Sequence, residues 1–349
     1  EMTSSLVGSE MCIRDSSEGA HPRIMEAMVK TNLEQTSGYS TDYHTENAKR
    51  LIKKAIDCDD VNIHILVGGT QTNAIAISSF LRPHQAAIGV DTAHINVHET
   101  GAIEATGHKV LTAQSEDGKL KPEMIQKIVN EHTDEHMVQP KLVYISNSTE
   151  IGTIYKLDEI KAIKECCNKN NLLLFLDGAR LGVGLTSKES DVKLSDLPKL
   201  CDAFYIGGTK NGALFGEALV ICNNSLNEDF RFLIKQKGAM LAKGRLLGIQ
   251  FEELFKDDLY FELARHANKM AILIKNAISE KGYKFKSDSS TNQQFPILPN
   301  DLISELEEKF SLGDIIRVDD KNSSIRIVTS WATDCLLYTS PSPRDSTSS

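Results

Sequence analysis

The sequence lacks an apolar stretch long enough to span a bilayer, and it lacks an excess of basic residues. Its 39 Lys and Arg residues are outnumbered by 48 Asp and Glu residues, which gives a formal net charge of −9. General nucleic-acid binding is expected to leave a basic footprint instead. The composition therefore argues against a membrane span and against nucleic acid as the partner.

Cysteine is scarce, and the spacing of the seven cysteines matches neither a zinc site nor a disulfide framework. Two of them, Cys12 and Cys335, fall in the terminal stretches discussed next. The first residues have no apolar core typical of a signal peptide, and no internal repeat is present. A reducing cytoplasm fits this pattern best, and no metal site is expected.

The two ends of the chain resemble translated adapter DNA. One codon choice for CLLYTSPSPRD, residues 335–345, has a reverse complement that reads LVGSEMCIRD in another frame. That string occurs at residues 6–15. The alternative is a natural low-complexity tail. We interpret residues 1–16 and 335–349 as adapter-derived, exclude them from the fold, and expect both natural termini to be missing.

Apolar runs bounded by glycine and polar residues predict seven strands of an α/β sheet that is covered on both faces. Helical patterns dominate after Cys222, and two later runs predict strands of a smaller α+β domain. We expect a large domain over 17–245 and a small one over 246–334. The predicted strands are 63–67, 87–90, 109–113, 142–146 and three within 172–222, followed by 285–295 and 325–329 in the small domain.

The stretch 172–222 carries three chemically distinctive residues. Asp177, Arg180 and Lys210 each follow a predicted strand, and Lys210 lies within the glycine-rich loop GGTKNG. Ligands of open α/β sheets bind beyond the carboxyl ends of the strands. Pyridoxal phosphate (PLP) chemistry needs a lysine for the Schiff base and an acid that keeps the pyridine nitrogen protonated. The pattern therefore predicts a PLP site, in which burial lowers the pKa of the Lys210 amine.

A second glycine-rich turn, GGTQTN at 68–73, connects a predicted strand to a predicted helix. Free backbone N–H groups and the positive end of a helix dipole would face an anion there. A simple tight turn is the alternative, but the lysine loop favours phosphate binding. The predicted phosphate contacts are Gly69, Thr70, Gln71 and Thr209.

The segments LDGARLG, GGTKNG and TAHINVHETGAIEATGHKV resemble the threonine aldolase and β-eliminating lyase family of fold-type I PLP enzymes. The resemblance covers nearly all of residues 17–334. It implies an aspartate-aminotransferase-like fold with a seven-stranded, mostly parallel sheet in a large PLP domain and a small C-terminal α+β domain. It also implies an amino-acid substrate and a homodimer or homotetramer.

The same resemblance assigns roles to further residues. His94 matches the residue that stacks on the PLP ring, whereas His98 and His108 have the ordinary structural interpretation. Arg326, in IRIVTSWAT, matches the arginine that grips the substrate carboxylate, and Arg180 matches a second contact of the carboxylate or the ring. The planar fork of arginine suits bidentate carboxylate binding, although a surface arginine on a strand is the alternative for Arg326.

One departure from the family concerns the catalytic base. Many threonine aldolases carry a histidine at the position matching SNSTE, whereas this chain has Ser148, Thr149 and Glu150 there. His94, Glu150 or an ordered water could take the proton, in that order of preference. A family serine that helps to bind the carboxylate matches near Ser16, at the predicted adapter junction.

We therefore expect PLP-dependent retro-aldol cleavage of β-hydroxy-α-amino acids, such as L-threonine or phenylserine-like substrates. A β-eliminating lyase or an aminotransferase on the same scaffold is one alternative, because a fold does not decide the reaction. A PLP-binding protein without turnover is the other.

Overall fold

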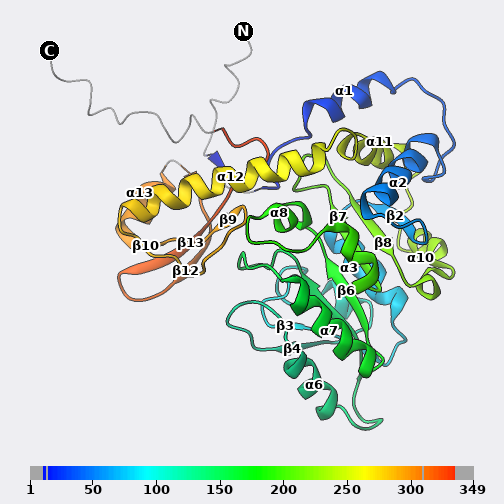
Figure 1. Ribbon diagram of the computed structural model, residues 1–349, viewed down its shortest axis with the longest axis horizontal. Coiled ribbons are helices and arrows are strands. Elements are labelled where there is room, and N and C mark those ends of the chain that lie inside the picture. Colours follow the sequence, from blue (N-terminus) through cyan, green and yellow to red (C-terminus); the bar gives the residue numbers. More distant parts are fainter. Residues whose placement is uncertain (1–10, 13–14, 309, 335–349) are drawn as a thin grey trace.

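The computed structural model describes residues 11–12, 15–308 and 310–334 (Figure 1). Most of the predicted adapter-derived stretches, at 1–10, 13–14 and 335–349, lies outside the described residues. Of the remainder, β1 (Met11–Cys12) pairs in parallel with β11 (Phe310–Ser311), and Asp15 is buried. The adapter interpretation of these few residues stays a prediction.

A seven-stranded sheet forms the centre of the molecule, and all seven predicted strands belong to it. Their side chains are almost wholly buried, as expected for strands that are covered on both faces. In the order across the sheet, the strands are β2 (Asn62–Leu66), β8 (Glu217–Ile221), β7 (Ala203–Gly207), β6 (Leu173–Asp177), β5 (Gln139–Ser146), β3 (Gln85–Val90) and β4 (Val110–Ala113).

The strand β8 runs against all the others, because it is antiparallel to both of its neighbours, β2 and β7. Only residues 208–216 connect β7 to β8. A parallel connection needs about a dozen residues or more, so this loop enforces the reversal. The first residue of β8, Glu217, consequently pairs with Gly207 at the carboxyl end of β7.

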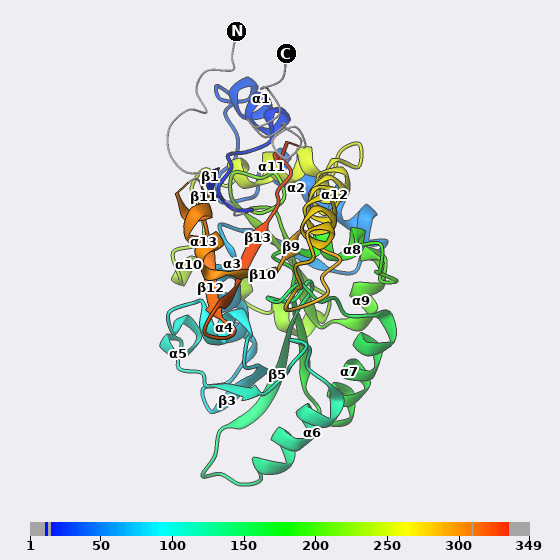
Figure 2. The ribbon, with the colours of Figure 1, turned by 90° about the vertical axis from the view of Figure 1, so that its left-hand side faces the viewer.

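Helices cover both faces of the sheet, and Figure 2 shows α6 and α7 on one side and α4 and α5 on the other. The helix α7 is amphipathic, and its buried side chains Ile160, Ile163 and Cys167 face the core. These covering helices are α3 (Gly69–Phe80), α4 (His94–Val97), α5 (Ala102–Ala105), α6 (Pro122–Glu131), α7 (Leu157–Lys169), α8 (Leu181–Thr186), α9 (Leu197–Leu200) and α10 (Phe230–Gln236). Short 3₁₀ turns occur at Leu194–Asp196 and Asn224–Asn227.

Two N-terminal helices, α1 (Pro22–Lys30) and α2 (Tyr43–Ile56), precede the sheet. Asp42 caps α2 by accepting a hydrogen bond from the backbone N–H of Thr45 at 2.9 Å. Both helices pack against α11 (Arg245–Leu254). The packing is so close that a Cβ at Gly248 would lie 2.5 Å from the Thr45 nitrogen. The domain division near residue 245 stays a prediction.

The C-terminal part is organised along α12 (Leu259–Glu280), the long helix that crosses the top of Figure 1. The predicted strand at 325–329 is present, whereas 285–295 forms only an isolated bridge and the two residues of β9, so that prediction is largely wrong. Most of that segment is a loop held by side-chain amides and hydroxyls. The remaining elements are β9 (Gln293–Gln294), β10 (Ile297–Pro299), α13 (Asn300–Glu307), β12 (Gly313–Arg317) and β13 (Asn322–Val328).

Candidate active site

A cavity of about 240 Å³ lies beyond the carboxyl ends of β5, β6 and β7, where an open α/β sheet is expected to bind its ligand. Most of the site residues predicted from the sequence line it, and Gln71 and Arg326 are the exceptions. Those that line the cavity are Gly69, Thr70, His94, Glu150, Asp177, Arg180, Thr209 and Lys210.

Asp177 is the last residue of β6, and three donors hold its carboxylate. The Tyr144 hydroxyl and the Asn73 amide donate to Oδ2, the latter at 3.2 Å, and the Ala179 backbone N–H donates to Oδ1 at 2.9 Å. Burial and the charge of Asp177 raise the pKa of Tyr144 well above its ordinary value, so its hydroxyl keeps the proton that it donates. A Cβ at the next residue, Gly178, would lie 1.8 Å from the Tyr205 carbonyl oxygen, which explains the glycine.

Lys210 lies in the loop between β7 and β8. The loop is fixed by the Asn211 side chain, which donates to the Tyr260 carbonyl at 2.7 Å, and by Gly212, whose φ of 93° is typical of glycine. Burial and then the neighbouring charge of Arg180 lower the pKa of the Lys210 amine. The structure thus brings this amine closer to the neutral form that a nucleophile needs, as the sequence predicts.

Glu217 lines the same cavity, and the sequence interpretation missed it. Its Oε2 accepts a hydrogen bond from the Gly208 backbone N–H at 3.1 Å, and the Thr209 hydroxyl also contacts this carboxyl group. Burial raises the pKa of Glu217 to about 8. The short loop before β8 is the sequence signal that could have placed Glu217 at this edge, because it dictates an antiparallel strand.

The predicted phosphate cradle forms the start of α3. No side chain caps this helix, and its first backbone bond runs from the Thr72 N–H to the Gly68 carbonyl at 2.9 Å. The N–H groups of the preceding residues therefore have no partner within the helix. The side chain of Gln71, however, accepts a hydrogen bond from the Val67 N–H at 3.1 Å and stabilises the turn itself.

His94 is the first residue of α4, and its Nδ1 lies 2.8 Å from Oε1 of Glu99. Glu150 approaches the same histidine from the loop after β5, because its Oε1 accepts from the His94 backbone N–H at 3.3 Å and from the Ser146 hydroxyl at 2.9 Å. Burial and the nearby Asp177 raise the pKa of Glu150. By contrast, His108 only bonds the Gln85 carbonyl, as the structural interpretation predicts.

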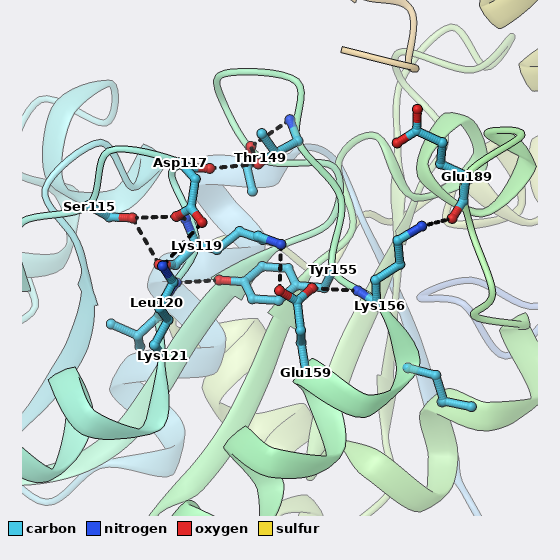
Figure 3. Close-up of polar contacts among 12 residues, drawn as sticks. Ser115, Asp117, Lys119, Leu120, Lys121, Thr149, Tyr155, Lys156, Glu159 and Glu189 are labelled. Atoms are coloured by element: carbon cyan, nitrogen blue, oxygen red, sulfur yellow. Dashed lines mark hydrogen bonds and ion pairs between the residues drawn. The ribbon is translucent and has the colours of Figure 1, made fainter. Parts of the chain in front are cut away.

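A group of polar residues that we call the Tyr155 cluster anchors the loop that carries Glu150 (Figure 3). Its centre is Tyr155, whose hydroxyl accepts a hydrogen bond from the Leu120 N–H at 2.6 Å. Lys119 pairs with Glu159 at 2.5 Å. The cluster comprises Ser115, Asp117, Lys119, Leu120, Thr149, Thr153, Tyr155 and Glu159.

The two arginines predicted to bind the substrate carboxylate both contact carboxylates of the chain itself. Arg180 holds Asp15 through Nε at 2.7 Å and Nη2 at 3.0 Å. Burial acts to raise the pKa of Asp15, but the positive charges of Arg180 and Lys210 outweigh burial and lower it. Arg326 lies outside the cavity lining and pairs with Asp314 at 2.7 Å, so its role in substrate binding stays a prediction.

The family described as β-eliminating lyase matches residues 13–300 of this chain. The chain belongs to this family. The low specificity L-threonine aldolase of Pseudomonas sp. (strain NCIMB 10558) is 34% identical over 279 residues, which cover 78% of this chain and 79% of that protein. The low specificity L-threonine aldolase of Pseudomonas aeruginosa is 31% identical and covers 84% of this chain, which spans 83% of that relative. The resemblance stated from sequence motifs is thereby confirmed.

Solved structures confirm the predicted fold class of this β-eliminating lyase family member. The threonine aldolase of Leishmania major superimposes with a TM-score of 0.92 at 48% identity, covering 93% of this chain and 95% of that chain. An aspartate aminotransferase of Thermus thermophilus is only 12% identical but has a TM-score of 0.68, over 94% of this chain and 86% of that chain. This second likeness shows the shared fold alone.

Proposed function

We propose that this lyase is a PLP-dependent aldolase that cleaves β-hydroxy-α-amino acids, with L-threonine giving glycine and acetaldehyde. The observation that carries the proposal is a lysine of lowered pKa in the same cavity as a buried, triply hydrogen-bonded aspartate. The names of the similar aldolases support the reaction.

The residues at the cavity fit PLP. Lys210 supplies the amine that would bond to the cofactor aldehyde, Asp177 supplies the acid for the ring nitrogen, and the uncapped start of α3 supplies N–H donors for the phosphate. Buried polar atoms without a protein partner, among them the Ser148 hydroxyl, also lie at this edge. When bound, PLP withdraws electrons from the substrate Cα and so stabilises the charge left there by bond cleavage.

Retro-aldol cleavage needs a group that takes the proton of the β-hydroxyl. A base must be unprotonated to act, and burial together with Asp177 raises the pKa of Glu150. His94 lines the cavity, and only its Nδ1 contacts Glu99, so its second ring nitrogen, Nε2, is not used by that contact. The contacts therefore favour His94 as the proton acceptor, with Glu150 nearby.

Arg180 fixes the orientation of the substrate in this proposal. Asp15, from the stretch interpreted as adapter-derived, uses two of the five N–H donors of the guanidinium, so Arg180 can still donate to a substrate carboxylate, and this proposal gives Asp15 itself no role. Holding the substrate carboxylate decides which Cα bond is cleaved, so orientation contributes to rate as well as to affinity.

A homodimer or homotetramer in the cytoplasm completes the proposal. Large apolar side chains are exposed on the N-terminal segment and on α10, including Leu33 at 93% and Phe232 at 76%, which supports association between copies. The five cysteines with described side chains are all free, which fits a reducing compartment. Sedimentation velocity of the purified protein tests the assembly, and a monomer at all concentrations would contradict it.

The reaction is tested by incubating the full chain with PLP and L-threonine and measuring acetaldehyde and glycine together. Equal amounts of both products are expected, and the Lys210→Ala variant serves as the control. Ammonia with 2-oxobutanoate would establish β-elimination instead. Amino-group transfer to an added 2-oxo acid would establish an aminotransferase, and no product from threonine or phenylserine would leave only cofactor binding.

A further inference from the structure

Glu99 is a buried acid that neither the sequence interpretation nor the proposed reaction uses. Its side chain is fully shielded from solvent, and its Oε1 lies 2.8 Å from Nδ1 of His94. It lies two residues after the end of α4 and directly before Thr100 and Gly101, which both have positive φ. The short helix thus places an acid directly behind the histidine of the cavity.

Asn73, from α3, connects this acid to Asp177. Its side-chain nitrogen donates to Oε1 of Glu99 at 2.8 Å and to Oδ2 of Asp177 at 3.2 Å. Asn73 has no exposed surface. One amide therefore joins Asp177, which would contact the nitrogen of a bound cofactor ring, to the acid that contacts His94.

The contacts define the hydrogen-bonding state of His94. An amide nitrogen can only donate, so the Glu99 oxygen that receives Asn73 is an acceptor. As an oxygen of a carboxylate, it can only accept from Nδ1 of His94 as well, which places the histidine proton on Nδ1. In the neutral ring Nε2 is then an acceptor, on a side chain that lines the cavity.

We propose that Glu99 is a positioning residue that, with Asn73, fixes His94 as the Nδ1–H tautomer and joins His94 and Asp177 into one rigid unit. Its catalytic consequence rests on the proposed function, because His94 then offers Nε2 as a proton acceptor during cleavage. The opposite case, a buried acid that only stabilises the fold, predicts no fixed tautomer and no specific effect on turnover.

The first experiment needs no cofactor. The full chain is labelled with ¹⁵N-histidine, and its ring nitrogens are recorded above the ordinary histidine pKa of about 6.5. The His94→Gln variant identifies the His94 signals by their loss. We expect a proton on Nδ1 and none on Nε2 in the wild type, and a mixture of tautomers in Glu99→Gln, because an amide can either donate or accept.

The matched control is Glu104→Gln, an exposed glutamate on α5 that should leave the His94 signals unchanged. A proton on Nε2 of His94 in the wild type, in the other tautomer or in the imidazolium, would overturn the proposal. An unchanged tautomer in Glu99→Gln would do the same.

The second experiment uses the PLP-loaded protein and separates positioning from stability. Glu99→Gln should lower kcat for threonine cleavage about 10–100-fold, the range found when a partner that orients a functional histidine is lost. KM, cofactor content and the melting temperature should stay close to wild type. A lower melting temperature with unchanged kcat per bound cofactor would leave only a structural role. If the wild type itself releases no product, the proposed function fails while the tautomer measurement still decides the role of Glu99.

Discussion

The Tyr155 cluster and the cavity at the strand ends are both built from polar side chains, but most of the cluster is half-buried, whereas Asp177 and Glu217 of the cavity are buried. Within the described residues, ten buried side-chain atoms lack a partner. Ser148 Oγ lines the cavity, Asn73 Oδ1 and Glu99 Oε2 belong to residues that bond its lining, and Asn147 Nδ2 lies next to Ser148, whereas the other six belong to other residues, such as Gln293 and Gln294. None of them belongs to the Tyr155 cluster. Buried polar groups are normally satisfied, so the unpartnered Ser148 hydroxyl in the cavity lining is what a ligand site would leave.

The pKa shifts of the acids differ in the same way. In the Tyr155 cluster, burial acts to raise the pKa of Asp117, but hydrogen bonds from Lys119 and Ser115 outweigh it, so the pKa is lowered. In the cavity, burial prevails and raises the pKa of Glu217 and Glu150. The Tyr155 cluster stabilises the charged form of an acid that holds loops together. The cavity instead shifts the pKa of its acids upward, and catalytic sites often contain groups with such shifted pKa values.

Lys210→Ala should have the largest effect on turnover. It removes both the amine that would bond to the cofactor and the group available to carry a proton, so the loss should exceed the roughly 10²–10⁴-fold of general acid–base catalysis alone. Steady-state kinetics with saturating PLP measure it. The matched control, Lys119→Ala in the Tyr155 cluster, should retain turnover per folded molecule. Equal losses of turnover in both variants would contradict the distinction between the cavity and the Tyr155 cluster.

Asp177→Asn should lower turnover about 10²–10³-fold, the scale of losing one preorganised charge-stabilising group. Some cofactor should remain bound, because the other contacts of the cavity are unchanged. Asp117→Asn makes the same chemical change in the Tyr155 cluster and should affect stability alone. Turnover and absorbance of the bound cofactor are measured for both, and a wild-type rate for Asp177→Asn would refute its role.

Tyr155→Phe should destabilise the fold by about 1–3 kcal/mol, because the buried Leu120 N–H loses its acceptor. Urea denaturation followed by circular dichroism gives the change in unfolding free energy. Turnover per bound cofactor should change little, since the variant keeps the ring that fills the core. A stability equal to wild type would show that this hydrogen bond contributes nothing.

Glu217→Gln should change the pH dependence of stability. The carboxyl has a pKa of about 8 in the fold against an ordinary value of 4.5, so the folded state binds more protons than the unfolded state between these values. Wild-type stability should therefore fall as pH rises through this window, and the glutamine variant should lose less. Melting temperatures of the apoprotein across the window test this, and parallel curves would contradict the buried acid.

The chemistry of the site was more predictable from sequence than its supporting contacts. Asp177 and Lys210 lie in glycine-containing segments next to predicted strands. Such a segment indicates both the place of a residue at the edge of the sheet and the reactive group that it brings there. Glu217 was missed because the direction of β8 was not deduced from the short loop. Glu99 and Asn73 gave no signal, since a contact between α3 and the segment after α4 depends on how these helices pack on the sheet.

The small domain was the least predictable part of the fold. The run at 285–295 has a phenylalanine at each end, yet it folds mainly as a loop because Ser and Gln side chains between them bond the backbone locally. Similarly, no sequence pattern showed that Arg180 would hold Asp15, because that pair joins residues 165 positions apart.

Borohydride reduction of the PLP-loaded protein tests most directly whether the cavity with unsatisfied groups is the cofactor site. Reduction makes the bond between the cofactor and its lysine permanent, and proteolysis with mass spectrometry then locates it. The account predicts the cofactor on Lys210 and the loss of that label in Lys210→Ala. A label on Lys119 or any other lysine, or no label at all, would contradict it.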